Sequence, residues 1–205
     1  MYMNEKIIRM VKDTDAQEIL SIYAHYIKET AITFEYEVPT LAEFTKRIRE
    51  ISSDYPYLVC WLDGNIIGYA YAHRQMERAA YQWNAELSVY IDKSHLHHGI
   101  GKALYSALIE ILQMQNMCNL YGSVTSPNKN SEKLHEAFGF SKLGIYHKTG
   151  YKCGAWHDVI WFEKNIGDCS LEPEPFISIQ KISKNAITEI LSRISKTSFD
   201  RNLSF

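Results

Sequence analysis

The segment from His95 to Gly101, His-Leu-His-His-Gly-Ile-Gly, constrains this chain more than any other stretch. It follows Ala85–Ile91, where apolar residues alternate as in a strand, and precedes Lys102–Gln115, where they recur at helical spacing. The first N–H groups of a helix have no partner inside it, and the helix dipole is positive there. Because Gly99 and Gly101 carry no side chain, an anion such as a phosphate can approach this backbone. The alternative is a plain turn, since short glycine patterns also arise by chance.

Length and composition narrow the class of protein. A chain of 205 residues suits one domain with room for a short appendage. With 46% hydrophobic residues and a net charge of −2, it has the balance of a globular protein and no basic field for nucleic acid or an acidic membrane. The cysteines at 60, 118, 153 and 169 form no CxxC pair, which predicts reduced thiols in a cytoplasmic protein and no metal site.

The order of apolar patterns predicts an α/β protein. We expect strands at 6–11, 57–62, 66–72, 81–91, 120–125, 142–147 and 158–163, with helices after 15, after 40, over 102–115 and from a cap at Asn130 or Ser131 to Phe138. This order predicts a mixed sheet with helices on both faces over residues 1–165. Residues 166–205 form an extension, with a linker at 171–175 and one amphipathic helix within 177–194. The extension can dock on the domain or on a second subunit.

Several stretches, in the same order along the chain, resemble the GNAT acetyltransferases, and more narrowly the phosphinothricin and methionine sulfoximine acetyltransferases. They are Ile7-Ile-Arg, His25–Thr30, Tyr55–Val59, Gly68-Tyr-Ala, Arg78–Tyr81, Trp83–Glu86, Ser88-Val-Tyr, His98–Gly101, Pro127-Asn, His135-Glu and Gly154–Asp158. The resemblance spans about Ile7 to Lys164. It implies a twisted sheet whose two middle strands splay apart, acetyl-CoA as cosubstrate, a small-molecule amine as acceptor, and a homodimer.

The resemblance assigns the cofactor-binding residues. The glycine turn would hold the diphosphate, a strand bulge near Val89 or Tyr90 would polarise the thioester, and the pantetheine arm would lie beside the same strand. These positions are Ser88, Val89, Tyr90, Ile91, Leu96, His97, His98, Gly99, Ile100, Gly101, Lys102, Asn128 and Ser131. One departure is Leu96, because the family usually has Gln or Arg there. Backbone amides supply most of such an anion site, so we expect weaker side-chain help without loss of the site.

Glu86 is the candidate general base. Alternation places Ala85, Leu87, Val89 and Ile91 on one face of the strand and Glu86 on the other with Ser88 and Tyr90. The amine must be neutral to attack, and an α-amine with a pKa of about 7.7–8.0 is mostly protonated at neutral pH. A carboxylate inside such a strand is poorly solvated and able to take the proton, directly or through a water. The alternative is a solvated edge strand with Glu86 in water.

His135 is the second catalytic candidate, in a place where most of the superfamily has tyrosine and the phosphinothricin branch has histidine. An imidazole with an ordinary pKa near 6.5 can accept the amine proton or donate one to the leaving sulfur. The alternative is a helix histidine bonded to its neighbours. Tyr90, Tyr105 and Tyr121 are weaker acid candidates.

Three residues are expected to bind the acceptor. Arg78 matches the family position that holds a carboxylate, and Phe34 and Tyr81 would wall the side-chain pocket. The family often has a second basic residue where this chain has Met76, which favours an acceptor less anionic than phosphinothricin.

These observations predict an N-acetyltransferase that acts on the α-amine of a small amino-acid analogue of the phosphinothricin, methionine sulfoximine or methionine sulfone type. The same resemblance implies a role in detoxification. One alternative is acetylation of a protein N-terminus or a polyamine, which an open acidic groove would favour. Another is a coenzyme A-binding regulator without catalysis, against which Glu86, His135 and the glycine turn together argue.

Overall fold

The computed structural model describes residues 6–168 and 172–199. Its strands are β1 (Ile7–Met10), β2 (Tyr57–Leu62), β3 (Asn65–Arg74), β4 (Asn84–Ile91), β5 (Asn119–Ser126), β6 (Ser141–Lys152) and β7 (Ala155–Asn165). Its helices are α1 (Ala16–Glu29), α2 (Leu41–Ser52), α3 (Ile100–Met114), α4 (Lys129–Ala137) and α5 (Lys184–Phe199). The strands form one mixed sheet in the order β1-β2-β3-β4-β5-β7-β6, with β4 and β5 parallel.

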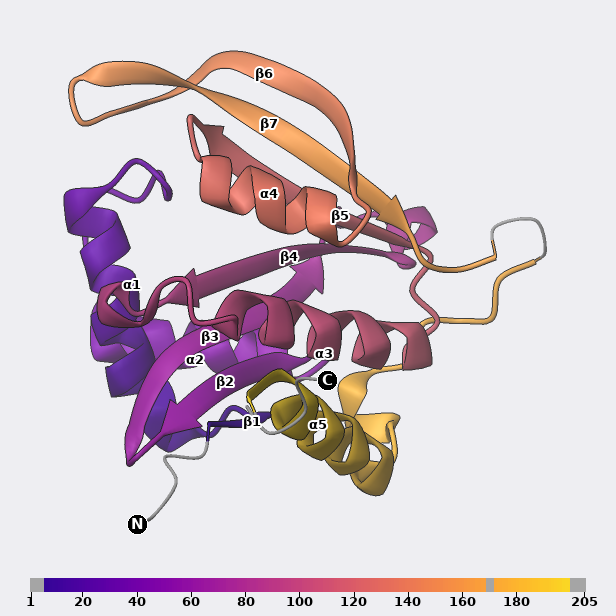
Figure 1. Cartoon of the computed structure of the whole chain (residues 1–205). Helices are drawn as coiled ribbons and strands as arrows, with labels where there is room; N and C mark the ends of the chain where they lie inside the picture. Colours follow the sequence, from indigo (N-terminus) through magenta and orange to yellow (C-terminus); the bar gives the residue numbers. More distant parts are fainter. Residues whose placement is uncertain (1–5, 169–171, 200–205) are drawn as a thin grey trace, which may run out of the picture.

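Helices cover both faces of the sheet, as Figure 1 shows. On one face, α1 and α2 pack against β2 and β3 through residues that include Ile19, Phe44 and Tyr69. On the other, the apolar stripe of α3, with Leu104 and Leu108 fully buried, lies over the middle strands. The predicted alternation along β4 is confirmed, because Ala85 and Leu87 belong to the core under α3. The α/β class and the helices on both faces are confirmed.

Several predicted boundaries were wrong. Helix α4 begins after Asn128 rather than Asn130 or Ser131, because the Asn128 side chain accepts a hydrogen bond from the Ser131 N–H and so caps the helix. Helix α3 starts at Ile100, two residues before the predicted start. Strands β6 and β7 are about twice as long as expected, because they pair with each other well beyond the body of the sheet (Figure 1).

The extension docks on the domain. Helix α5 packs against α3 and β1, and Ile187, Leu191 and Ile194 join the core cluster. The Ser195 hydroxyl accepts a hydrogen bond of 2.9 Å from the Ile8 N–H. This bond satisfies one backbone group on the outer edge of β1, which no further strand covers in the described part of the chain. The predicted helix thus exists as α5, but it runs on to Phe199. Of the predicted linker, residue 171 lies outside the described residues.

No disulfide joins Cys60, Cys118 and Cys153, and burial raises the pKa of Cys60 to about 12. Cys169 lies outside the described residues. In the part of the chain that the structure describes, no group of His, Cys, Asp or Glu side chains is arranged to hold a metal ion. Within residues 6–168 and 172–199, none of the helices combines the length and apolar character that crossing a membrane requires.

Candidate active site

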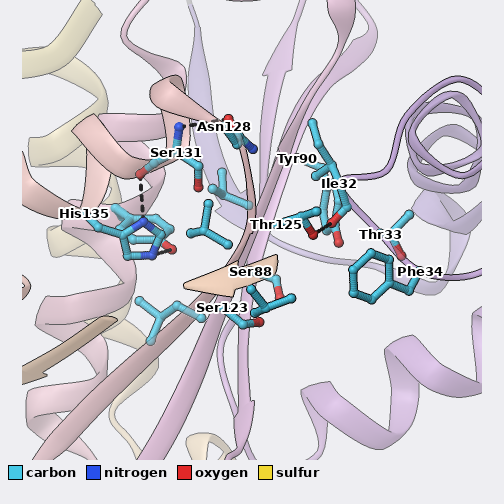
Figure 2. A pocket seen from close by; sticks show the side chains of 15 residues that line it. Ile32, Thr33, Phe34, Ser88, Tyr90, Ser123, Thr125, Asn128, Ser131 and His135 are labelled. Atoms are coloured by element: carbon cyan, nitrogen blue, oxygen red, sulfur yellow. Dashed lines mark hydrogen bonds between the residues drawn. The ribbon is translucent and has the colours of Figure 1, made fainter. Parts of the chain in front are cut away.

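The two middle strands part early. β4 pairs with β5 only from Asn84 to Glu86, opposite residues 119–121, although both strands continue. A cavity of about 230 Å³ opens beyond that point. It is lined from both faces of the sheet by Ile32, Thr33, Phe34, Leu87, Ser88, Val89, Tyr90, Tyr105, Ser123, Val124, Thr125, Asn128, Ser131, His135 and Val159. Figure 2 shows the α4 residues on one side of the strands and the loop around Phe34 on the other.

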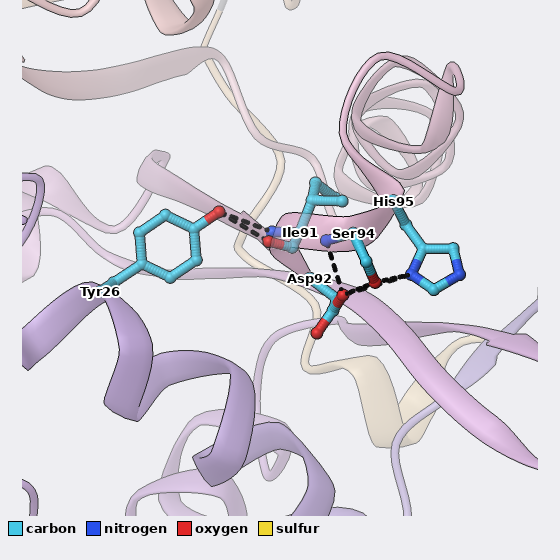
Figure 3. A network of polar contacts seen from close by, with 5 residues as sticks. All are labelled: Tyr26, Ile91, Asp92, Ser94 and His95. Atoms are coloured by element: carbon cyan, nitrogen blue, oxygen red, sulfur yellow. Dashed lines mark hydrogen bonds and ion pairs between the residues drawn. The ribbon is translucent and has the colours of Figure 1, made fainter. Parts of the chain in front are cut away.

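Along β4, the backbone N–H and C=O groups of the odd-numbered residues face this gap. The Asp92 N–H donates to the Ile67 carbonyl of β3, whereas the backbone of Ile91 is bound from the opposite side by the Tyr26 hydroxyl (Figure 3). Because successive peptide groups alternate direction along a strand, the Val89 N–H is directed away from β3 and toward the cavity. The predicted bulge is absent here, since the β3–β4 register stays constant from Gly68 opposite Ile91 to Arg74 opposite Ala85.

The glycine turn forms an open cradle at the start of α3. Gly99 is the N-cap residue with φ 76°, and no side chain caps the helix there. A Cβ added at Gly99 would have no atom within 4 Å, so the space that a diphosphate would fill is clear. His97 also has a positive φ of 64°, and the side chains of Leu96, His97, His98 and Lys102 are exposed. The uncapped amides and the nearby ammonium group of Lys102 fit a diphosphate.

Between β4 and the cradle, a short network of polar contacts holds the connecting turn in place. Asp92 accepts hydrogen bonds from the Ser94 N–H and hydroxyl, and His95 Nδ1 lies 3.3 Å from the same carboxylate (Figure 3). The hydrogen bonds from Ser94 and the contact with His95 outweigh partial burial and lower the pKa of Asp92. The carboxylate therefore stays charged and holds the turn that leads from β4 to the cradle.

His135 is a buried residue of the cavity wall. Its ring lies over Gly122, where a Cβ would come within 2.1 Å of Nε2, so β5 needs a glycine at this point. Nδ1 donates to the Ser131 carbonyl over 2.8 Å, and the Tyr105 hydroxyl lies 3.1 Å from Nε2. Burial lowers the pKa of His135, and the bond to the carbonyl offsets only part of this effect. The imidazole is therefore neutral, and Nε2 accepts from Tyr105.

Glu86 lies at the branch point of β4 and β5, half-buried. Its Oε1 accepts a hydrogen bond of 2.6 Å from the Ser123 hydroxyl, and Ser123 lines the cavity. The carboxylate therefore stands on the face of the sheet opposite Ala85 and Leu87, which is the α1/α2 side. It lies beside the cavity, but Glu86 is not among the described residues that line it. Ser123 was not predicted, although Tyr121, Ser123 and Thr125 alternate with apolar residues, and this polar face was a usable signal.

The predicted acceptor residues do not lie together. Phe34 lines the cavity, and its ring packs over Gly150 of β6, where a Cβ would come within 2.3 Å. Tyr81 lines a separate depression near β6. Arg78 is exposed before a short turn of 3-10 helix, Ala79–Tyr81, and among the described residues it lines neither of these cavities.

Lys152 is a residue that sequence patterns did not indicate. Its side chain is 5% exposed, and Nζ donates to the Thr33 carbonyl over 2.6 Å. It fastens the loop around Phe34 to the β6–β7 hairpin, together with the hydrogen bond from the Tyr36 hydroxyl to the Tyr151 carbonyl. Burial lowers the pKa of Lys152. Nothing in the local sequence marks this lysine, because its partner lies 119 residues away.

A mixed sheet that splays beside an uncapped glycine turn defines an acyltransferase fold of the GNAT class, and comparison with known proteins agrees. The model of the acetyltransferase (GNAT) domain matches residues 8–161, and the chain belongs to this family. Phosphinothricin N-acetyltransferase of Streptomyces viridochromogenes is 31% identical over 175 residues, 85% of this chain and 95% of that protein.

Two further relatives point the same way. The L-methionine sulfoximine/L-methionine sulfone acetyltransferase of Salmonella typhimurium is 26% identical, over 78% of this chain and 95% of that protein. The crystal structure of a phosphinothricin acetyltransferase from Sinorhizobium meliloti in complex with AcCoA superposes with a TM-score of 0.81 at 29% identity. The superposed part makes up 87% of this chain and 98% of the chain from Sinorhizobium meliloti. The chain is therefore an acetyltransferase of the GNAT family.

Proposed function

We propose that this protein transfers the acetyl group of acetyl-CoA to the α-amine of a small amino-acid analogue of the methionine sulfone, methionine sulfoximine or phosphinothricin type. One observation carries the proposal: Glu86 stands where β4 and β5 part, bonded to a hydroxyl that lines a cavity running through the sheet. The similarity to acetyltransferases that act on such amines supports the acceptor class.

The residues that would hold acetyl-CoA fall along one path. The amides of Gly99, Ile100, Gly101 and Lys102 would bind the diphosphate, with the side chains of His97 and His98 nearby. The edge of β4 from Ser88 to Ile91 would pair with the pantetheine arm, opposite Asn128 and Ser131 on α4. When bound, acetyl-CoA supplies an acetyl thioester.

The Val89 N–H is the group that would polarise the reacting carbonyl. It points into the gap and belongs to a strand that pairs with β3 from Ala85 to Ile91. A fixed donor aimed at the developing oxyanion contributes about 3–4 kcal/mol in well-studied enzymes. Sequence alone left Val89 and Tyr90 as equal candidates, and the alternation of peptide groups favours Val89.

Glu86 would take the proton from the amine. The Ser123 hydroxyl occupies one oxygen of the carboxylate, which leaves the other for the amine or for an intervening water. Ser123 lines the cavity, so this hydrogen bond ties the carboxylate to the cavity wall.

His135 and Tyr105 would act together at the opposite wall. Tyr105 Oη holds a proton, burial raises the pKa of Tyr105, and His135 Nε2 fixes the direction of the hydroxyl. We propose Tyr105 as the acid that protonates the leaving thiolate, with His135 as the residue that positions its hydroxyl. The hydroxyl turns from Nε2 to the sulfur and gives up its proton, and the tyrosinate is reprotonated from solvent once coenzyme A has left. Both residues line the cavity.

On the acceptor side, Arg78 would bind the carboxylate, Tyr81 would contact the side chain from the depression that it lines, and Phe34 would contact the acceptor from the cavity between β4 and β5. We also propose a homodimer. The aromatic side chains of Tyr36, Tyr151 and Trp156 are 69%, 48% and 60% exposed and cluster at the tip of the β6–β7 hairpin. Exposed aromatic clusters of this kind are typical of interfaces. In sedimentation equilibrium, Trp156→Glu should be a monomer. If the variant remains a dimer, this surface is not the dimer interface.

The proposal is tested by release of free thiol from acetyl-CoA over a panel of amines. Turnover of amino-acid analogues, and not of polyamines or peptide N-termini, is the expected result. If only peptides or polyamines are acetylated, the acceptor is a peptide or polyamine and the proposed acceptor class is wrong. A protein that binds coenzyme A and acetylates no amine would be a binding protein rather than an enzyme.

A further inference from the structure

A second depression, of about 410 Å³, lies on the same face of the sheet as Glu86. Strands β6 and β7 form its outer wall, and the connection between β3 and β4 forms its inner wall. It is lined by Gln75, Met76, Tyr81, Asn84, Tyr121, Leu143, Gly144, Ile145, Tyr146 and Trp161.

Two residues that line this depression are neighbours of Glu86, which is not itself part of the lining. Tyr121 is the residue of β5 paired with Glu86 in the parallel ladder, and Asn84 precedes Glu86 by two positions on the same face of β4. Ser123, which binds Glu86, is paired with Trp161 across β5 and β7. An amine held at Glu86 therefore has the depression on one side and the acetyl-donor cavity on the other.

The lining of the depression is neutral. Among the described residues that form it, no side chain carries a charge, and four are aromatic. The rings of Tyr146 and Trp161 lie 5.7 Å apart between centroids, at 52°. An ionised phosphinate placed here would lose water without gaining a counter-ion, whereas an apolar or aromatic group would gain buried contact area. Met76, 45% exposed, is part of the wall and supplies no charge that could pair with an anion.

We propose that this depression binds the side chain of the acceptor, and that it selects α-amines with a neutral apolar or aromatic substituent over those with an anionic one. The inference rests on the proposed function and gives its substrate class.

The test compares kcat/KM for L-phenylalanine, L-methionine sulfone and phosphinothricin in the full-length protein. The neutral acceptors should exceed phosphinothricin at least tenfold. Met76→Lys adds a cation to the wall and should shift the ratio of phosphinothricin to methionine sulfone at least tenfold toward phosphinothricin. The matched control is Leu41→Lys, a 42% exposed apolar residue on α2, which should leave the ratio unchanged.

Tyr81→Ala provides a second variant at an exposed site, and it should lower kcat/KM for phenylalanine more than for glycine, which has no side chain to bind. If the wild type acetylates phosphinothricin with a kcat/KM equal to or above that for the neutral acceptors, the inference is wrong, but the proposed acetyl transfer is not contradicted. The inference also fails if Met76→Lys leaves the ratio unchanged. A protein that acetylates none of these amines, although glycine is acetylated, contradicts it as well, whereas no acetylation of any amine refutes the proposed function itself.

Discussion

The Ser123 hydroxyl donates a hydrogen bond of 2.6 Å to the Glu86 carboxylate, and so joins β5 to β4 at the last point where the two strands pair. Beyond this contact the strands separate around a cavity. The hydrogen bond therefore fixes a carboxylate at the mouth of a gap in the sheet. In the mechanism proposed above, this is where the amine loses its proton.

Replacement of Glu86 by Gln should lower kcat at pH 7 by about 100-fold, the usual effect of losing a general base. The defect should shrink as pH rises, because the amine then loses its proton to water. Coenzyme A binding, measured by calorimetry, should be unchanged. Glu136→Gln, at an exposed site on α4, serves as the control. Normal turnover by the Glu86 variant at pH 7 would remove Glu86 from the mechanism.

Gly99→Ala should weaken coenzyme A binding at least tenfold, because alanine resists the φ of 76° and its Cβ would stand in the cradle. Binding of pantetheine, which lacks the diphosphate, should be little affected. Gly64→Ala is the matched control, since Gly64 also has a positive φ, of 92°, and open space around it, but lies in the β2–β3 turn. Equal affinities for the two variants would show that the turn does not bind the diphosphate.

The free energy of unfolding should decrease as the pH falls from about 6.5 toward 5, in part because of His135. Burial lowers the pKa of His135 in the folded state, so the unfolded chain takes up the proton first. Stability from the neutral imidazole is thus complete above the unfolded pKa and is lost as the pH falls toward the folded pKa. The slope from this residue is at most about 1.4 kcal/mol per pH unit.

Urea denaturation of the wild type and of His135→Gln at several pH values measures this slope. The variant should be less stable at pH 7 and should depend less on pH between 6.5 and 5. The same slope in both proteins would mean that other groups cause the acid sensitivity.

Ser195→Ala should destabilise the protein by about 1–3 kcal/mol, because the Ile8 N–H would be left without its buried partner. Ser192→Ala, at an exposed position on the same helix, should change stability by less than about 0.5 kcal/mol. Thermal or chemical denaturation of the two variants gives the comparison. If they behave alike, the contact between α5 and β1 contributes nothing measurable.

Much of the fold could be predicted from the sequence because its determinants are local. Alternation along 85–91 identifies the central strand and places Glu86 opposite the core face, and helical spacing identifies α3. The boundaries that failed depend on partners elsewhere. Strands β6 and β7 extend because they pair with each other, and α4 starts early because Asn128 caps it.

The sequence by itself determined the order of elements, the glycine turn before α3 and the presence of a carboxylate in β4, since all three follow from residue type and spacing along a short stretch. Only the tertiary structure decided which groups meet: Ser123 at Glu86, His135 over Gly122, and Ser195 on Ile8, 187 residues away. Such contacts depend on how separate elements pack, where buried polar groups must find partners and side chains must fill space, and no local pattern encodes that geometry.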